Sequence, residues 1–370
     1  MGVKKKIGML PGDGIGPEVV AEARKVLDAI ATRHGHTFEY GYGDVGAIAI
    51  DKTGEPLPDE TLRLCEQSDA FLFGAIGHPK YDNDPSAKVR PEQGLLKLRK
   101  SLGLSVNIRP VTAYDSLIHM SPLKTEKILG VDLVVYRELT GGIYFGEKGR
   151  TKDGAYDHCT YSNFEIDRIA HLAFQAAEHR SKKVTLVDKA NVLETSRLWR
   201  ERVTEIAKEY PSITLDCMFV DNAAMQMIQN PKQFDVILTE NMFGDIISDE
   251  ASVIGGSLGL LPSASVGDKT AMFEPIHGSY PQATGKNIAN PLGTILSAAM
   301  MLDHLGLVDE AIEIRQAVNA SLRNGMVTED LAKDEGYGTD RVGDFIVNHI
   351  LDGEESTGQS NIQAGMSTII

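Results

Sequence analysis

The chain has 370 residues, a formal net charge of −15 at pH 7 and an apolar content of 42%. This length suits two packed units, and the ordinary apolar content excludes global disorder. The acidity argues against a nucleic-acid-binding protein, because nonspecific affinity for nucleic acid comes from lysines and arginines that neutralise phosphates. Because the chain as a whole is acidic, local groups of arginines become informative about where an anionic ligand could bind.

Neither export nor membrane insertion is indicated by the sequence. The apolar run before Pro11 is too short for the core of a signal peptide. The most apolar late segment, Leu292 to Leu302, has the length of a buried helix rather than of a membrane span. Cys65, Cys159 and Cys217 are far apart and lack CxxC spacing, which argues against a disulfide framework and a zinc knuckle. We therefore expect a cytoplasmic protein without a membrane partner.

Strand-like and helical patterns follow one another along the chain. A short strand precedes a glycine-rich turn, after which Pro17 suits the first turn of a helix. Ser162 and Glu165 form a capping-box pattern at the start of another helix. The other expected elements are strands at Ile7–Leu10, Ala70–Phe73, Val131–Tyr136, Val184–Val187, Ile213–Val220 and Val236–Leu238, and helices at Glu92–Lys100, about 192–209 and about 222–229. This interleaving predicts an α/β fold with a mainly parallel sheet.

Two carboxylates four residues apart, Asp245 and Asp249, are candidate metal ligands. If a helix begins near Gly244, both lie on one face, where they repel each other unless a cation bridges them or solvent screens them. Such hard oxygen ligands suit Mg²⁺ or Mn²⁺. Asp221, just after the strand Ile213–Val220, adds a third carboxylate at the end of a strand, where α/β sheets bind ligands. The alternative is that the two acids only complement the helix dipole.

Three arginines and two further side chains are candidates for anion binding and proton transfer. Arg109 and Arg137 stand at the ends of strand-like segments, and Arg99 closes a helical stretch. The planar guanidinium matches carboxylates in bidentate fashion, although surface arginines often only solvate a face. Tyr144 and Lys189 each follow a strand in a short turn, where they are suited to proton transfer or to a structural role.

Two glycine-containing segments are candidates for a nucleotide site. Gly12, Gly14 and Gly16 resemble a dinucleotide fingerprint, but Pro17 takes the place of its third glycine, so we reject a Rossmann domain. The better candidate is Glu274–Pro291, a long loop of a kind that is usually functional in compact domains. We interpret its final Asn-Pro as a helix N-cap followed by an N1 proline.

Seven segments together resemble the 3-isopropylmalate dehydrogenases: Pro11–Glu18, Glu92–Lys100, Asn107–Pro110, Arg137–Gly146, Val187–Glu194, Asn241–Glu250 and Glu274–Pro291. These enzymes belong to the β-decarboxylating dehydrogenases, with the isocitrate, homoisocitrate and tartrate dehydrogenases. The resemblance covers about residues 5 to 350. It implies a two-domain α/β fold that is not a Rossmann domain, with a discontinuous cofactor-binding domain (1–104 and 257–370) and an inserted substrate and dimerisation domain (105–256). We expect a mobile tail at 352–370.

The resemblance implies oxidative decarboxylation of (2R,3S)-3-isopropylmalate to 4-methyl-2-oxopentanoate and CO₂ with NAD reduction, in leucine biosynthesis. It also implies a homodimer with a shared active site. Carried over, the metal ligands for Mg²⁺ or Mn²⁺ are Asp245, Asp249 and Asp221 of the partner subunit. The implied base is Lys189, which also reaches into the partner's site, and the implied proton donor to the enolate is Tyr144. The residues expected to bind substrate are Leu95, Arg99, Arg109, Arg137 and Asp221.

Specificity is expected to depend on two places. Leu95 and Leu96 offer an apolar wall where isocitrate-using relatives have polar residues; we expect one leucine to be core and choose Leu95 as the contact. Gln282 stands where NAD-preferring relatives have an Asp and NADP-preferring relatives have a Lys. Because position 282 lacks that Lys, we expect the chain to prefer NAD. The residues expected to bind the cofactor are Glu92, Glu274, His277, Gly278, Ser279, Gln282 and Asn290. The open alternatives are a sister dehydrogenase for isocitrate, homoisocitrate or malate/tartrate, a carboxylate-metal phosphohydrolase and a metabolite-binding protein.

Overall fold

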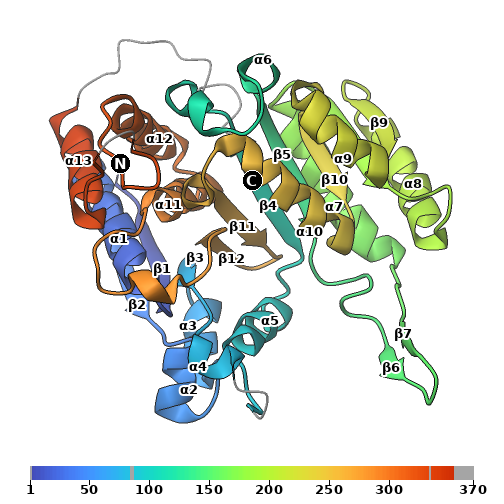
Figure 1. Cartoon of the computed structure of the whole chain (residues 1–370), viewed down its shortest axis with the longest axis horizontal. Helices are drawn as coiled ribbons and strands as arrows, with labels where there is room; N and C mark the ends of the chain where they lie inside the picture. The colour runs from blue at the N-terminus through green and yellow to red at the C-terminus, as the bar shows by residue number, and fades with distance from the viewer. Residues whose placement is uncertain (1, 84–86, 333–334, 354–370) are drawn as a thin grey trace. The chain divides into compact units, whose positions relative to one another are not determined.

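The computed structural model describes residues 2–83, 87–332 and 335–353 (Figure 1). The chain forms two compact units: unit 1 runs from the N-terminus to Leu104 and continues from Ser257 onward, and unit 2 is Ser105–Gly256. Asp352, which we expected in a mobile tail, is instead the last residue of helix α13 (Thr339–Asp352). The remainder of the expected tail, from residue 354, lies outside the described residues.

Unit 1 contains five strands in the order β2-β1-β3-β12-β11. Their bounds are β1 Lys4–Gly12, β2 Thr37–Tyr42, β3 Ala70–Ala75, β11 Pro262–Val266 and β12 Ala271–Pro275. All neighbours are parallel except β11 and β12, which are antiparallel. Every residue of β3, β11 and β12 is buried, as expected for strands whose two faces are both covered.

The helices of unit 1 cover this sheet (Figure 1). Their bounds are α1 Gly16–His34, α2 Ala47–Thr53, α3 Asp59–Glu66, α4 Pro79–Asp82, α5 Pro91–Ser101, α11 Leu292–His304, α12 Val308–Arg323 and α13. Helix α1 begins beside Pro17, as predicted, and packs against α11 and α13. Helix α11 is buried along almost its whole length, which confirms the buried helix expected there. No helix of the described ranges is long and apolar enough to cross a membrane.

The main sheet of unit 2, in the part that the structure describes, has the strand order β4-β5-β10-β8-β9. Their bounds are β4 Val106–Thr112, β5 Asp132–Glu138, β8 Lys183–Asp188, β9 Thr214–Phe219 and β10 Val236–Thr239. Neighbours are parallel except β4 and β5. A separate pair, β6 (Lys148–Arg150) and β7 (Ala155–Asp157), is antiparallel. The predicted α/β fold with a mainly parallel sheet is therefore confirmed.

The helices of unit 2 are α6 Thr125–Ile128, α7 Asn163–Glu178, α8 Glu194–Ile206, α9 Val220–Gln229 and α10 Asn241–Ser252. The capping box before α7 is confirmed, because Ser162 N–H donates to the Glu165 carboxylate at 2.7 Å and Ser162 Oγ accepts from Glu165 N–H. Short 3₁₀ turns are η1 Asp115–Met120, η2 Ala207–Glu209, η3 Pro231–Gln233, η4 Val253–Gly255, η5 Leu258–Leu260 and η6 Pro281–Ala283.

Two predicted helix starts in unit 2 are wrong by a few residues. Helix α10 begins at Asn241 rather than near Gly244, because the Glu240 side chain accepts a hydrogen bond from Phe243 N–H and caps the helix at that point. Helix α9 begins at Val220 rather than at about 222: β9 ends at Phe219 and α9 follows at once, so Asp221 lies in the first turn of α9.

Candidate active site

Asp245 and Asp249 project from α10 away from the core of unit 2. Ile247 and Ala251, on the opposite face of the helix, are fully buried in that core. The earlier start of α10 keeps both aspartates inside the helix, so their spacing of four residues places them on one face. Both carboxylates remain accessible to solvent. This pair is therefore available to a ligand.

Arg137 reaches the first of these carboxylates. It lies inside β5 rather than after it, and its guanidinium donates to Asp245 and, at 2.9 and 3.2 Å, to the amide oxygen of Asn241. Gly244 leaves room for this side chain: a Cβ at position 244 would lie 2.6 Å from Arg137 Cγ. The sequence Asn241–Asp245 thus provides both the acceptors for the guanidinium and the space that it occupies.

Arg109 reaches the second carboxylate. It lies within β4, not at its end, and its Nη1 donates to Asp249 Oδ1 at 2.7 Å and to Ser248 Oγ at 2.8 Å. Its Nε donates to Asn107 Oδ1 at 2.9 Å. Two guanidinium cations therefore balance the charge of two aspartates along one face of α10.

Tyr144 and Lys189 each contact one of the predicted acids. Tyr144 Oη donates to the second oxygen of Asp245 at 2.9 Å, and its pKa is raised by burial and by this carboxylate. Lys189 Nζ donates to Asp221 Oδ1, and this hydrogen bond lowers the pKa of Asp221. Lys189 also lies 5.8 Å from the centre of the Phe219 ring. The structure thus pairs Lys189 with Asp221 and groups Tyr144 with Asp245.

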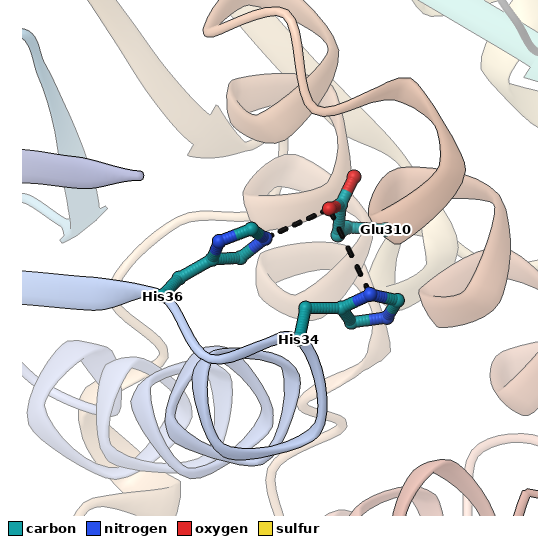
Figure 2. Close-up of side chains that lie close together, drawn as sticks. All are labelled: His34, His36 and Glu310. Atoms are coloured by element: carbon teal, nitrogen blue, oxygen red, sulfur yellow. Dashed lines mark hydrogen bonds and ion pairs between the residues drawn. The ribbon is translucent and has the colours of Figure 1, made fainter. Parts of the chain in front are cut away.

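Asp221 does not join Asp245 and Asp249 in one cluster of the described chain. The single group of three His, Cys, Asp or Glu side chains found there with ligand atoms within 4.8 Å is His34, His36 and Glu310 in unit 1, as Figure 2 shows. Its residues were not among those predicted from sequence.

The His34–His36–Glu310 cluster is better suited to linking helices than to binding a metal. Val3 N–H donates to His36 Nδ1 at 3.1 Å, so Nε2 carries the ring proton and donates to Glu310 at 2.8 Å (Figure 2). A metal ligand needs that nitrogen deprotonated. His34 stands in the last turn of α1 and Glu310 in the first turn of α12, where each complements its helix dipole.

In unit 1, Arg99 and Glu274 form an ion pair. Arg99 Nη2 donates to Glu274 Oε1 at 2.7 Å. Arg99 Nε is buried without a hydrogen-bond partner among the described residues, so it retains a donor for a ligand. On the same helix, Leu96 is 51% exposed and is not the core residue that we expected, whereas Leu95 packs partly against the core cluster of Leu98.

The loop Glu274–Pro291, which we call the cofactor loop, borders a cavity of about 730 Å³ in unit 1. Of the predicted cofactor residues, His277, Gly278 and Asn290 line it. Its other lining residues are Ile15, Ser257, Leu258, Gly259, Tyr280, Ile288, Ala289, Glu329 and Asp330. Sequence reasoning missed these last residues, since several come from segments remote in the chain. Gln282 is exposed and is not among the lining residues.

His277 and Asn290 carry the polar atoms most suited to a ligand in this cavity. Burial lowers the pKa of His277, and its Nε2 is buried without a hydrogen-bond partner in the described part of the chain. Asn290 Nδ2 donates to Asp330 at 3.0 Å. Asn290 is not the N-cap that we expected, because α11 begins at Leu292 after Pro291, although its Oδ1 still accepts from Leu292 N–H at 3.0 Å.

The fold is that of the isocitrate/isopropylmalate dehydrogenases. The sequence model of that family matches residues 6–346, and the chain belongs to it. This confirms the family inferred from the seven sequence segments, and it removes the support for a phosphohydrolase or a purely binding protein.

Individual proteins that resemble this chain include 3-isopropylmalate dehydrogenases and solved structures of other β-decarboxylating dehydrogenases. The chain is 55% identical over 347 residues to the 3-isopropylmalate dehydrogenase of Bacteroides fragilis, which covers 93% of this chain and 98% of the relative. It is 57% identical over 353 residues to that of Wolinella succinogenes, covering 94% and 98%. Among solved structures, isocitrate dehydrogenase from Methylococcus capsulatus superposes with a TM-score of 0.83 at 38% identity, covering 94% of this chain and 99% of that one. A β-decarboxylating dehydrogenase from Thermococcus kodakarensis gives 0.81 at 36%, covering 96% and 100%.

Proposed function

We propose that the protein is an NAD-dependent 3-isopropylmalate dehydrogenase, which oxidises and decarboxylates (2R,3S)-3-isopropylmalate to 4-methyl-2-oxopentanoate and CO₂ in leucine biosynthesis. The observation that carries this proposal is identity above 50% with enzymes of that name over more than nine-tenths of the chain. All three cysteines are free thiols, which supports the expected cytoplasmic location.

The arginine–aspartate pairs support a site for a metal and a dicarboxylate together. Arg109 and Arg137 balance Asp249 and Asp245 in the structure described above. A divalent cation and a doubly charged substrate add no net charge to this group. The aspartates can therefore turn to the cation while the arginines turn to the substrate carboxylates, and each charge keeps a partner.

The donor set fits Mg²⁺ or Mn²⁺. Asp245 and Asp249 supply hard carboxylate oxygens from one helical face, and solvent or substrate would complete the coordination. Held by these carboxylates, a divalent cation would supply Lewis-acid polarisation of the substrate's C2 oxygen and electrostatic stabilisation of the charge left as CO₂ departs. Because Asp221 does not lie with the other two aspartates in the described chain, we propose that Asp221 of the partner subunit is the third ligand.

Two side chains are proposed to move protons. Lys189 would accept the C2 hydroxyl proton as the carbon is oxidised, and its ion pair with Asp221 means that both side chains reach the partner's site together. Tyr144 would protonate the carbon that loses CO₂. A tyrosine hydroxyl is ordinarily protonated at neutral pH, and burial and Asp245 raise the pKa of Tyr144 further.

The cavity beside the cofactor loop is proposed to hold NAD. His277 contributes an unpartnered buried nitrogen, and Gly278 and Asn290 contribute polar groups along the wall. NAD, when bound, accepts the hydride from C2 of the substrate. We propose that Glu92, Glu274, Ser279 and Gln282 complete the site, with Gln282 near the adenosine ribose.

Substrate choice is proposed to depend on α5. Arg99 keeps a free donor for a carboxylate, and the exposed side chain of Leu96 joins Leu95 as an apolar surface for the isopropyl group. A third carboxylate, as in isocitrate, would lose its hydration there without gaining a partner, at a cost of about 2–7 kcal/mol. An apolar wall discriminates weakly among alkyl groups, so related alkylmalates are expected to react.

A homodimer is proposed because α9 and η4–α10 leave an apolar surface uncovered. Met225 and Ile228 on α9, and Ile246 on α10 with Val253 after it, are exposed although they are large and apolar. Helices α9 and α10 contact each other, so these side chains lie on neighbouring elements of one unit. A second copy of the same surface would bury them around a two-fold axis.

The proposal is tested by initial rates of NAD reduction with 3-isopropylmalate, isocitrate, malate and tartrate, each with Mn²⁺ and with chelator. We expect the highest kcat/KM with 3-isopropylmalate, and loss of activity on chelation. A preference for isocitrate or malate would assign the chain to a sister activity of the same family. Absence of NAD reduction with every one of these acids would overturn the proposal.

A further inference from the structure

Of the segment Pro11–Glu18, which we call the glycine turn, only Ile15 has been placed so far, at the wall of the cavity. The glycines of this turn resemble a phosphate-binding fingerprint, yet their close neighbours are protein backbone. A Cβ at Gly12 would lie 2.0 Å from Ala75 O, and one at Gly14 would lie 1.9 Å from Ser279 O. The glycines therefore allow the turn to approach β3 and the cofactor loop closely.

The glycine turn holds the cofactor loop at Ser279. Ile15 N–H donates to Ser279 O at 2.8 Å, and Gly14, with φ of +60°, packs directly against the same carbonyl. The next loop residue, Tyr280, has the left-handed backbone (φ 37°, ψ 64°) that residues with side chains adopt rarely. Such a conformation persists only where its surroundings fix it, and the contact at Ser279 does so. Tyr280 is left 54% exposed at the wall of the cavity.

Two further contacts fix the rest of the loop to the same segment. Ile15 and Val19 form a buried cluster with Ala283 and Ala289 of the cofactor loop. The Glu18 carboxylate accepts a hydrogen bond from Gly285 N–H. The cofactor loop is thus held along its length, from Ser279 to Ala289, by the glycine turn and by α1.

Asp13 links the glycine turn to a third segment. It is 5% exposed, and its carboxylate accepts hydrogen bonds from the backbone N–H groups of Ala47, Ile48 and Gly77 at 2.9, 3.0 and 3.0 Å. Position 77 is close to two predicted cofactor residues, since a Cβ there would lie 3.0 Å from a Glu92 carboxylate oxygen and 3.6 Å from Ser279 Oγ. Asp13 therefore fixes Gly77 beside the loop that the turn also fixes.

We propose that the glycine turn positions the NAD site. Gly14 and Ile15 fix the position of the cofactor loop at Ser279, and Asp13 fixes the position of the backbone at Gly77, beside that loop. The inference rests on the proposed function, because it takes the loop-lined cavity to be the NAD site. Gly14 and Asp13 are positioning residues, acting on the cofactor through Ser279 and Gly77. Ile15 holds Ser279 through its backbone N–H and also lines the cavity itself. Binding of 3-isopropylmalate to the arginines and aspartates of unit 2 does not depend on them.

The first test compares Gly14→Ala with Gly35→Ala in the full chain. Gly35 has nearly the same backbone (φ of +68°), but nothing lies within 4 Å of its added Cβ, so it reproduces the backbone strain without the clash. Calorimetric titration with NAD should give a dissociation constant raised on the order of tenfold to hundredfold for Gly14→Ala. Gly35→Ala should bind NAD like the unmodified protein. The KM for 3-isopropylmalate at saturating NAD should not change in Gly35→Ala, and in Gly14→Ala it should rise by a much smaller factor than the NAD dissociation constant, since only Arg99 among the proposed substrate residues is paired with the loop.

Asp13→Asn is the second variant, and it serves if Gly14→Ala does not fold. The amide keeps the shape of Asp13, but its NH₂ group must face one of three backbone donors, so the NAD dissociation constant should rise by a smaller factor. Unchanged NAD affinity in the folded variants, or equal losses in NAD and 3-isopropylmalate parameters, would overturn the positioning role. Failure of the unmodified protein to bind NAD would overturn the proposed function itself, and with it this inference.

Discussion

Lys189, at the end of β8, donates a hydrogen bond to Asp221 in the first turn of α9. Under the proposed function, any subunit that supplies the base would therefore also supply the third metal ligand. Asp245 and Asp249, in contrast, are held by Arg137 and Arg109. The proposed shared active site would thus combine one of these groups from each subunit.

The first prediction concerns complementation between two inactive variants. Lys189→Ala and Asp245→Asn should each be inactive alone, because every site of each homodimer lacks one group. Mixed dimers contain one site with Lys189 from one chain and Asp245 from the other, so co-expression should recover about a quarter of the wild-type rate. The measurement is the rate of NAD reduction by co-expressed, separately tagged chains.

The control for complementation is the mixture of Lys189→Ala with Asp221→Asn. Since both residues reach the same site from the same chain, every site in that mixed dimer lacks one of them. No activity should be recovered. Equal recovery in both mixtures would contradict the pairing, and recovery in neither would contradict the shared site.

Gly244→Ala should displace Arg137. The added Cβ would lie 2.6 Å from Arg137 Cγ and 2.8 Å from its Cβ, both parts of a buried side chain. We expect a loss of about 1–3 kcal/mol in the free energy of unfolding, together with a raised KM for 3-isopropylmalate. Denaturant unfolding and steady-state kinetics measure the two effects.

A matched control for Gly244→Ala is Gly154→Ala in the same unit, where the new Cβ meets only Thr151 Oγ1 at 3.5 Å. That variant should keep both its stability and its KM. Wild-type substrate affinity in Gly244→Ala would show that the placement of Arg137 is not critical.

The free energy of unfolding is expected to decrease as the pH is lowered below about 6.5, the ordinary pKa of histidine. Burial lowers the pKa of both His277 and His304 from 6.5, so in this window the unfolded chain binds more protons than the folded one. Their contribution is complete above about pH 6.5 and is lost as the pH falls towards the folded-state pKa. The measurement is the free energy of unfolding against pH for the wild type and for His277→Gln.

Removing one of these histidines should flatten that pH dependence, since glutamine does not titrate. His158→Gln, the same substitution at an exposed position, is the control. An identical slope in the wild type and His277→Gln would mean that His277 is not held neutral by the fold.

Gln282→Lys is expected to improve the use of NADP. Gln282 is exposed on the cofactor loop, and a lysine there would place a positive charge where the 2′-phosphate is proposed to lie. The ratio of kcat/KM for NADP to that for NAD should rise. Thr284→Lys, at another exposed position of the loop, should leave the ratio near that of the wild type. Equal ratios in both variants would reject the placement of Gln282.

The fold was predictable because its signals are local. Alternating apolar strands and amphipathic helices indicated the α/β class, and the Ser162–Glu165 capping box fixed the start of α7. The errors occurred where one side chain decides a boundary. Glu240 starts α10 earlier than Gly244 suggested, and no periodicity in the sequence contains that information.

The candidate site was predictable only as a set of residue types. Arg109 and Arg137 were recognised, but their pairing with Asp249 and Asp245 depends on strand register and helix rotation. The role of the glycine turn was not foreseen, because Gly14 and Ser279 are remote in sequence and meet only in the folded unit. Of Leu95 and Leu96 we expected Leu95 to be the contact and the other to be core, and only the structure shows that Leu96 faces solvent.

The central claim is most directly tested by measuring the products formed from 3-isopropylmalate and NAD with Mn²⁺ present. The account predicts equal amounts of NADH, CO₂ and 4-methyl-2-oxopentanoate, with no turnover once the metal is chelated. NADH formation without CO₂, or turnover that persists in chelator, would contradict the metal-dependent decarboxylation proposed for Asp245 and Asp249.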